Sequence, residues 1–288
     1  MHPINCFLSF ADSRMHKALI RIESQASAMR LFDDIRVIDE SKLDTVFKTR
    51  WEQQLVKGSR GFGYWVWKPY LIWKTLESLP DNSTLLYCDA GSHLNPRGRK
   101  KMQKYYNALS ADSLGIKAFP VFSLFYSNPE KFWTKGDLLS HFSCRERLDI
   151  TESPQIEATH ILLKKNNFTL TFVRQWYQIY LDNFALIDDS PSKSANMEGF
   201  KENRHDQSAF SLLFKKYGCV PFEEEETLPF ITSNPIWGCR DRGLNPPPSL
   251  RTQCIKSYIK YALAKLHRLF PKQTSYLISV LKKVTNTN

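Results

Sequence analysis

The segment from Arg60 to Asn95 constrains the fold of this chain more than any other. It reads RGFGYWVWKPYLIWKTLESLPDNSTLLYCDAGSHLN. The pattern is a turn broken by Gly61 and Gly63, a helix of about four turns, a Pro-Asp-Asn turn and a short apolar run that ends in Asp89. Ligands of an open α/β sheet bind at the carboxyl ends of its strands, so the pattern predicts that Asp89 faces a ligand. The alternative is that Asp89 only caps a turn.

The helix of this segment is rich in aromatic side chains but carries a lysine at its start. Aromatic residues at helical spacing indicate a face packed on the core. Pro69 fits only near a helix N-terminus, which places Lys68 in the first turn. That end of a helix attracts anions. A basic group there, facing a strand-end carboxylate, predicts a bound diphosphate together with a divalent metal.

The N-terminal part of the chain has the rhythm of an α/β fold. Residues 4–11 form an apolar run, Asp12 can cap a helix with apolar residues at steps of three and four, and residues 35–38 form a second apolar run. Strand, helix and strand in this order predict a mostly parallel sheet with right-handed crossovers. The loop from Ala11 to Arg14 then lies on the ligand face of the sheet.

A second candidate site follows a stretch without periodicity. Residues 188–203 are polar and interrupted by Pro and Gly, which is typical of a mobile surface loop and makes them the candidate lid. The next helix carries His205, Asp206 and Gln207 in its first turn and ends at Gly218. These three side chains project in different directions, so at least one is predicted to act in chemistry. The alternative is an Asp206 N-cap with a surface histidine.

Two further polar positions are candidates for ligand contacts. Residues 132–137 read as a loop entering a helix and bring Trp133, Lys135 and Asp137 together. The same pattern is also that of a capped helix start. Gln155 precedes an apolar run and is a candidate for a hydroxyl contact.

Five motifs in order resemble one family. They are FLSFADSR, GFGYWVWKPYLI, LLYCDAGS, WTKGD and ENRHDQSAFSLLFKKYG, and they span roughly residues 5–240. Together they resemble bacterial surface-polysaccharide glycosyltransferases with the GT-A fold, an α/β fold with a mostly parallel sheet flanked by helices. The resemblance implies transfer of a sugar from a nucleotide-diphosphate donor, with UDP-galactofuranose as the leading candidate. The implied acceptor is a hydroxyl of a lipid-linked glycan in O-antigen or capsule synthesis.

The resemblance also implies roles for individual residues. Implied donor contacts are Phe10, Ala11, Asp12, Arg14, Arg60, Lys68, Tyr70, Asp89, Ala90, Gly91 and Arg240. Implied acceptor or sugar contacts are Trp133, Lys135, Asp137 and Gln155. Asp206 would take the proton of the acceptor hydroxyl, His205 would orient Asp206 or reach a metal, and Gln207 would hold hydroxyls. A nucleotide contact and a simple N-cap both stay open for Asp12.

A divalent metal, Mn²⁺ or Mg²⁺, held partly by Asp89, is implied to neutralise the leaving diphosphate together with Lys68 and Arg240 or Arg242. The sequence departs from the usual Asp-x-Asp pattern because Asp-Ala-Gly lacks the second aspartate. Metal dependence therefore stays open. Inversion with Asp206 as base is the preferred outcome, and retention is the alternative.

Charge predicts an anionic partner. The net charge is +11. Residues 1–245 form the predicted catalytic domain. Positive charge is most concentrated in residues 246–288, a C-terminal region that begins with a Pro-Pro-Pro linker. Basic and apolar residues alternate there as in a pair of amphipathic helices, which favours an anionic membrane surface. The alternatives are a tail that binds nucleic acid or a helix packed on a partner. At the level of function, the competing hypothesis is a basic nucleic-acid-binding protein without activity, but no RNP run, KH loop or zinc finger occurs, so nucleic acid is not an expected partner.

The remaining composition predicts a location. Six cysteines show no CxxC pair and no metal-ligand spacing, which predicts free thiols in a reducing compartment. No secretory signal and no apolar run long enough to span a bilayer is present. We therefore expect a cytoplasmic enzyme on the inner face of the bacterial inner membrane.

Overall fold

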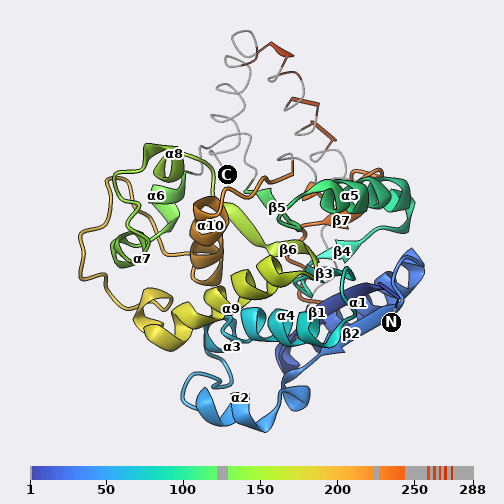
Figure 1. Ribbon diagram of the computed structural model, residues 1–288, viewed down its shortest axis with the longest axis horizontal. Coiled ribbons are helices and arrows are strands. Elements are labelled where there is room, and N and C mark those ends of the chain that lie inside the picture. Colours follow the sequence, from blue (N-terminus) through green and yellow to red (C-terminus); the bar gives the residue numbers. More distant parts are fainter. Residues whose placement is uncertain are drawn as a thin grey trace.

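A five-stranded sheet forms the centre of the protein, in the order β2-β1-β3-β6-β5 (Figure 1). The computed structural model describes residues 2–121, 129–222, 227–243, 258–259, 262–263, 266, 269–270 and 274. The strands are β1 (Asn5–Phe10), β2 (Asp34–Ile38), β3 (Thr84–Cys88), β5 (Ile116–Pro120) and β6 (Ile156–Lys164). β1 is parallel to β2 and β3, whereas β6 is antiparallel to β3 and β5. The α/β class with a mostly parallel sheet is confirmed, with β6 reversed.

Helices cover both faces of the sheet because its strands alternate their side chains. Phe10 and Leu8 of β1 join one core cluster and Phe7 joins the other. The first cluster is completed by α4 (Trp67–Ser78), α9 (Asn167–Asp182) and α10 (Asp206–Lys216). The second is completed by α1 (His16–Met29) and α5 (Arg99–Ala111). The predicted strands at residues 4–11 and 35–38 and the amphipathic helix between them are confirmed.

The helix after the Gly-Phe-Gly turn begins later than its aromatic pattern alone indicates. A short α3 (Gly61–Tyr64) ends at Trp65, whose backbone is left-handed with φ 60°, and α4 starts only at Trp67. Lys68 is thus the second residue of α4 and Pro69 the third, as Pro69 predicted. A side chain at Gly61 would come within 2.4 Å of the Trp65 ring, so this turn requires glycine.

Short elements complete the fold. They are η1 (Ser13–Met15), η2 (Glu40–Lys42), α2 (Thr45–Arg50), β4 (His93–Leu94), η3 (Pro96–Gly98), α6 (Glu130–Trp133), α7 (Gly136–His141), α8 (Leu148–Thr151), η4 (Phe184–Leu186) and β7 (Ile236–Trp237). α6, α7 and α8 lie together beside α10 (Figure 1). β4 and β7 pair antiparallel, which brings the chain after β7 back to the loop that follows β3.

Most of the C-terminal region, including the Pro-Pro-Pro linker, lies outside the described residues, so the boundary near residue 246 stays a prediction. Tyr258 contacts the body, since its hydroxyl lies 3.1 Å from Thr232 Oγ1. No helix within the described ranges is long and apolar enough to cross a bilayer. The five cysteines of the described part are free, and Cys254 lies outside it.

Candidate active site

Lys68 joins the two acidic residues that the sequence singled out. Its Nζ lies 3.1 Å from Asp89 Oδ1 and 2.5 Å from Asp206 Oδ2, and it donates to the carbonyl of Ala158 at 3.2 Å. The Lys68 side chain is 2% exposed, Asp206 is 7% exposed and Asp89 is 29% exposed. The hydroxyl of Tyr87 also donates to Asp89, at 2.5 Å. The end of β3 and the start of α10 thus meet at one buried ammonium, and we call these three residues the Lys–Asp–Asp cluster.

Burial and charge oppose each other in this cluster. Burial would lower the pKa of Lys68, but the Asp206 and Asp89 carboxylates outweigh it and raise the pKa above its ordinary value. Burial raises the pKa of Asp206 to about 6, against the lowering effect of Lys68 and with a further rise from Asp89. At neutral pH Lys68 is therefore an ammonium and Asp206 a carboxylate. Asp206 takes up a proton as the pH falls through about 6.

His205 is a buried residue held in a strained backbone conformation. Its φ of 54° and ψ of −120° are unusual for a residue with a side chain, and strain of this kind often marks functional sites. Nδ1 donates to the carbonyl of Ile187 at 2.6 Å, and the ring stacks on Trp65 with centroids 5.6 Å apart. Burial lowers the pKa of His205, so the ring is neutral at pH 7 and Nε2 carries the lone pair.

The structure contradicts the alternative of an Asp206 N-cap with a surface histidine. Asp206 is the first residue of α10, and the N-cap position is His205, which makes no side-chain capping bond. The Asp206 carboxylate pairs with Lys68 instead, and His205 is 2% exposed rather than on the surface. The His205 ring donates its hydrogen bond to Ile187. Within the described residues no hydrogen bond joins the His205 ring to Asp206, so the role of His205 in orienting Asp206 stays a prediction.

A buried polar network lies under the start of α10. Gln207 donates to Gln155 Oε1 at 2.6 Å, and the Gln155 amide donates to Glu130 Oε1 at 3.0 Å. Glu130 is fully buried and pairs with Lys215 Nζ at 2.7 Å. Gln155 is 1% exposed, so in this structure it positions α10 on the sheet, and its sugar contact stays a prediction.

The Trp-Thr-Lys-Gly-Asp segment holds the 188–203 loop. Lys135 Nζ donates to the carbonyls of Asp188 and Ser190 at 3.0 and 3.1 Å. The Asp137 carboxylate accepts from the backbone N–H groups of Lys193 and Ser194 at 2.8 and 2.6 Å. A Cβ at position 136 would lie 2.4 Å from the carbonyl of Ala195, which explains the glycine of this segment. Two of the predicted acceptor contacts thus fasten the candidate lid, and their contact with the acceptor itself stays a prediction.

We expect Asp137→Ala to release this loop. Burial alone would raise the pKa of Asp137, but the N–H groups of Ser194 and Lys193 outweigh it and lower the pKa, so the charged carboxylate holds them at pH 7. Losing both bonds should lower the free energy of unfolding by about 1 kcal/mol. Trypsin cleavage after Lys193 should become severalfold faster, as followed by mass spectrometry.

The control for this prediction is Asp149→Ala. Asp149 also lies in the first turn of a short helix, but its side chain is 62% exposed and pairs only with Arg147. It should leave cleavage after Lys193 unchanged. Equal cleavage rates in the Asp137 variant and the wild type would show that the contacts do not hold the loop.

The residues predicted to contact the donor at the end of β1 have structural contacts of two kinds: Phe10 is buried in the core, and Asp12 caps a short helix. Phe10 is buried, and its ring lies 4.1 Å from that of Trp67 between centroids. Asp12 caps η1, accepts from Arg14 N at 3.0 Å and pairs with the Arg14 guanidinium at 2.5 Å. The N-cap alternative for Asp12 is therefore what the structure shows, and its nucleotide contact stays a prediction.

Tyr70 lies in a different environment from the cluster. Its hydroxyl donates to the carboxylate of Asp44, and its ring packs between Phe47 and Tyr177. Its partners come from α2 and α9, whereas Lys68, two residues earlier, reaches β3 and α10. The role of Tyr70 as a donor contact gains no support from these partners.

Three arginines from separate segments lie close enough to one another for their charges to interact. Burial lowers the pKa of Arg204, Glu202 raises it, and the charges of Arg240 and Arg60 lower it further. The Arg204 guanidinium lies 4.0 Å over the Trp133 ring. The segment of Arg240 is fixed to the loop after β3, since Asp241 N donates to Gly91 O at 2.8 Å. Arg60, Arg204 and Arg240 form what we call the arginine rim. Sequence reasoning missed Arg204, although its place in the Asn-Arg-His-Asp motif was the available signal.

A second hidden group of side chains fixes the loop that carries Asp89. Ser92 Oγ lies 2.7 Å from His160 Nε2, and His160 Nδ1 lies 2.7 Å from Glu157 Oε1. Ser92 N also donates to the carbonyl of Asp89 at 2.9 Å. Ser92 and His160 are buried, so this group positions the Asp-Ala-Gly loop on β6. The sequence did not predict this group. His160 comes next to the end of β3 only through the pairing of β6 with β3, in which it lies opposite Cys88.

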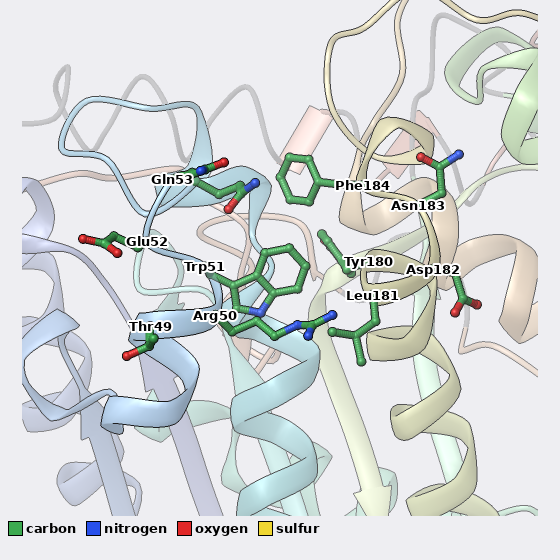
Figure 2. A pocket seen from close by; sticks show the side chains of 11 residues that line it. Thr49, Arg50, Trp51, Glu52, Gln53, Tyr180, Leu181, Asp182, Asn183 and Phe184 are labelled. Atoms are coloured by element: carbon green, nitrogen blue, oxygen red, sulfur yellow. The ribbon is translucent and has the colours of Figure 1, made fainter.

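A polar pocket of about 540 Å³ lies elsewhere, between the end of α2 and the end of α9 (Figure 2). It is lined by residues 49–54 and 180–184, among which the rings of Trp51 and Phe184 lie next to each other with centroids 5.6 Å apart. No predicted site residue lines it. Tyr180, which lines this pocket, is connected to His205 through Tyr64. The Tyr180 hydroxyl donates to the carbonyl of Tyr64 at 2.9 Å, and the Tyr64 ring contacts His205.

The acidic residues of the cluster do not fit a bound divalent metal. Such an ion needs about six oxygen ligands, several of them from carboxylates or carbonyls. Asp89 and Asp206 both face the Lys68 ammonium. No group of three His, Cys, Asp or Glu side chains that could hold a metal occurs within the described part of the chain. The metal implied by the resemblance is thus not supported by these residues.

Fold and site together define an α/β protein with a buried Lys–Asp–Asp cluster at the carboxyl end of a central strand. No family model and no curated protein matches the chain. A glycosyltransferase involved in the glycosylation of the major capsid of PBCV-1 is 13% identical, with a TM-score of 0.47 over 88% of this chain and 100% of that one. GlyE of Streptococcus pneumoniae TIGR4 is 10% identical, with a TM-score of 0.45 over 95% and 64%. Mouse xyloside xylosyltransferase 1 is 11% identical, with a TM-score of 0.40 over 76% and 84%. We therefore infer the chemistry of the site from its own residues.

Proposed function

We propose that this protein is a GT-A-type glycosyltransferase. It moves a sugar from a nucleotide-diphosphate donor, with UDP-galactofuranose as the leading candidate, to a hydroxyl of a lipid-linked glycan in O-antigen or capsule synthesis. The observation that carries the proposal is the Lys–Asp–Asp cluster: a carboxylate with a raised pKa lies beside a strand-end aspartate. The segment of Arg240, one member of the arginine rim, is hydrogen-bonded to the loop that carries Asp89. Perturbed carboxylates next to clustered cations are typical of catalytic sites.

The proposed reaction is an inverting displacement. The acceptor hydroxyl attacks the anomeric carbon while Asp206 takes its proton. The bond from that carbon to the diphosphate breaks, and the leaving group keeps the electron pair. The arginine rim neutralises the charge that develops on the diphosphate. Because the Asp206 side chain is only 7% exposed, admission of the acceptor requires an opening movement. The 188–203 loop is the proposed lid, since its Asp189 lies 3.6 Å from His205 Nε2, next to Asp206 in the chain.

The test of the proposal is selective binding of a nucleoside diphosphate. UDP should raise the melting temperature of the protein by several degrees, and a random oligonucleotide at equal charge concentration should raise it less. A donor screen with a lipid-diphosphate acceptor then identifies the sugar, and NMR of the product gives the stereochemistry. A larger shift with the oligonucleotide would favour the competing hypothesis of a basic nucleic-acid-binding protein.

The pH dependence of transfer follows from Asp206. Its pKa in the folded protein is about 6, so kcat/KM should rise as the pH increases through about 6 and level off above it. The contribution of Asp206 to the free energy of unfolding changes with pH in the opposite direction. It is fully present below about pH 3.9, the pKa of an aspartate in the unfolded chain. As the pH rises through the folded-state pKa of about 6, up to about 3 kcal/mol of this stabilisation is lost.

Both slopes can be measured between pH 4.5 and 8. Transfer rates give the first, and the difference in unfolding free energy between the wild type and Asp206→Asn gives the second, because other carboxylates cancel in that difference. A rate that falls across this range would rule out Asp206 as the base.

We propose that the C-terminal region attaches the enzyme to the cytoplasmic face of the inner membrane. At its described positions, Ile259, Leu266, Leu269 and Phe270 are between 45% and 71% exposed. Exposed apolar side chains within a basic segment favour insertion into an anionic interface. The net charge of +11 adds attraction to acidic lipids.

Leu269→Asp should weaken binding to anionic vesicles by about tenfold or more, because a leucine side chain inserted in the interface contributes about 1.5–3 kcal/mol. The matched control is Leu148→Asp in α8, where the leucine is 66% exposed. Vesicle flotation at constant salt measures both. If Leu269→Asp and Leu148→Asp bind anionic vesicles equally well, the C-terminal region does not attach the protein to the membrane.

A further inference from the structure

The Lys68 ammonium fills a cation site of its own. An ammonium group has three N–H donors. Three oxygens surround it within 3.2 Å, from Asp89, Asp206 and Ala158. They come from the end of β3, the start of α10 and β6, so one side chain connects three separate elements. The ring centroids of Trp67 and Tyr87 lie 5.9 and 5.5 Å from Nζ, and the Lys68 side chain is only 2% exposed.

A divalent metal would compete with this ammonium for the same carboxylates. One oxygen of each carboxylate, Asp89 Oδ1 and Asp206 Oδ2, already contacts Lys68. The two carboxylates raise the pKa of Lys68, so its charge persists at all physiological pH values. A metal ion next to that charge would be repelled, and it would need ligands beyond Asp89 and Asp206. The loop after β3 offers alanine and glycine at the next two positions instead of a second aspartate.

Positive charge for a leaving diphosphate is available from another source. The arginine rim comes from three separate segments. The Arg60 side chain is 45% exposed and pairs with Asp189 at 3.2 Å and with Glu202 at 3.6 Å. The Arg204 side chain is 28% exposed and pairs with Glu202 at 3.0 Å, so a diphosphate at the rim takes the place of these carboxylates. Guanidinium groups bind phosphate oxygens through paired N–H donors and stay charged at every relevant pH.

We propose that the donor site works without a divalent metal: Lys68 takes the place of the metal between Asp89 and Asp206, and the arginine rim neutralises the diphosphate. This inference rests on the proposed function. The bond changes are those of the inverting displacement, in which the acceptor proton goes to Asp206 and the electron pair goes to the diphosphate. No further reactant is required.

The first test measures the intact, full-length protein in EDTA and in Mn²⁺ or Mg²⁺. Transfer and the UDP-induced shift in melting temperature should agree within about twofold between the buffers. A loss of tenfold or more in EDTA that Mn²⁺ restores would overturn the inference and leave the proposed function intact. Absence of both turnover and UDP binding in every buffer would refute the proposed function, and the inference with it.

The second test uses metal binding without turnover. Without nucleotide, Mn²⁺ should leave the melting temperature of the wild type unchanged. Lys68→Ala frees both carboxylates, and Mn²⁺ should then raise its melting temperature by several degrees. A rise in the wild type that Asp89→Asn abolishes would overturn the inference, and this measurement does not depend on folding of the Lys68 variant.

The third test concerns the arginine rim. Arg204→Met should weaken UDP binding in EDTA about tenfold. The control is Arg147→Met, since Arg147 is 61% exposed and pairs with Asp149 outside the site. Unchanged UDP affinity in both variants would remove Arg204 from the diphosphate site.

Discussion

Asp206→Asn is expected to lower the transfer rate by about a hundredfold or more, which is the usual contribution of a positioned general base. The side chain keeps its size and polarity but can no longer accept a proton. Lys68 loses one of its two carboxylates and keeps Asp89, so the loss of stability should stay near 2 kcal/mol, below that of an isolated buried charge. kcat from a radiolabelled donor assay and unfolding in urea measure the two effects.

The control for this variant is Asp149→Asn, which removes a carboxylate from the first turn of another helix at the surface. It should change neither quantity beyond error. Near-normal turnover of Asp206→Asn, with the fold intact by circular dichroism, would remove the base from the mechanism.

Lys68→Met should have the largest effect on stability of any single substitution in the site. Methionine preserves most of the volume but leaves the Asp206 carboxylate buried without its cation, next to Asp89. Removing one partner of a buried ion pair costs about 3–5 kcal/mol. Because Lys68 lowers the pKa of Asp206, its loss should also move the rise of the pH–rate profile above pH 6.

A double-mutant cycle separates the pair from other effects of the substitution. In Lys68→Met with Asp206→Asn, the uncompensated charge is gone, so the double variant should be more stable than the sum of the single losses predicts by about 1–3 kcal/mol. Denaturant unfolding of all four proteins at pH 7.5 gives this coupling. Additive losses would show that the two charges do not stabilise each other.

Local patterns in the sequence were sufficient to predict the elements that carry the site. The apolar run before Asp89 forms β3, and Pro69 places Lys68 in the first turn of α4. The polar triplet at residues 205–207 opens α10. These predictions succeeded because strand periodicity, proline geometry and helix-terminal residues depend on neighbours within a few positions.

The start of α4 shows the limit of such patterns. The aromatic spacing after Gly63 continues smoothly, yet Tyr64 and Trp65 both have positive φ and interrupt the helix. This kink places the Trp65 ring against His205, a residue far away in the sequence. A stacking contact of this kind outweighs local helix preference, and the segment alone contains no sign of it.

Tertiary structure alone decided what the charged residues do. The sequence predicted Lys68, Asp89 and Asp206 as separate candidates. Only the tertiary arrangement, in which the first turn of α4 meets the end of β3 and the start of α10, makes one ammonium serve both carboxylates. Burial in that arrangement raises the pKa of Asp206 to about 6. Asp137 was predicted as an acceptor contact, which stays a prediction, and the structure adds that its carboxylate holds the 188–203 loop. The type and order of elements follow from short-range preferences, whereas the burial and partner of a charge depend on which distant segments meet, and those two quantities set its pKa and its chemistry.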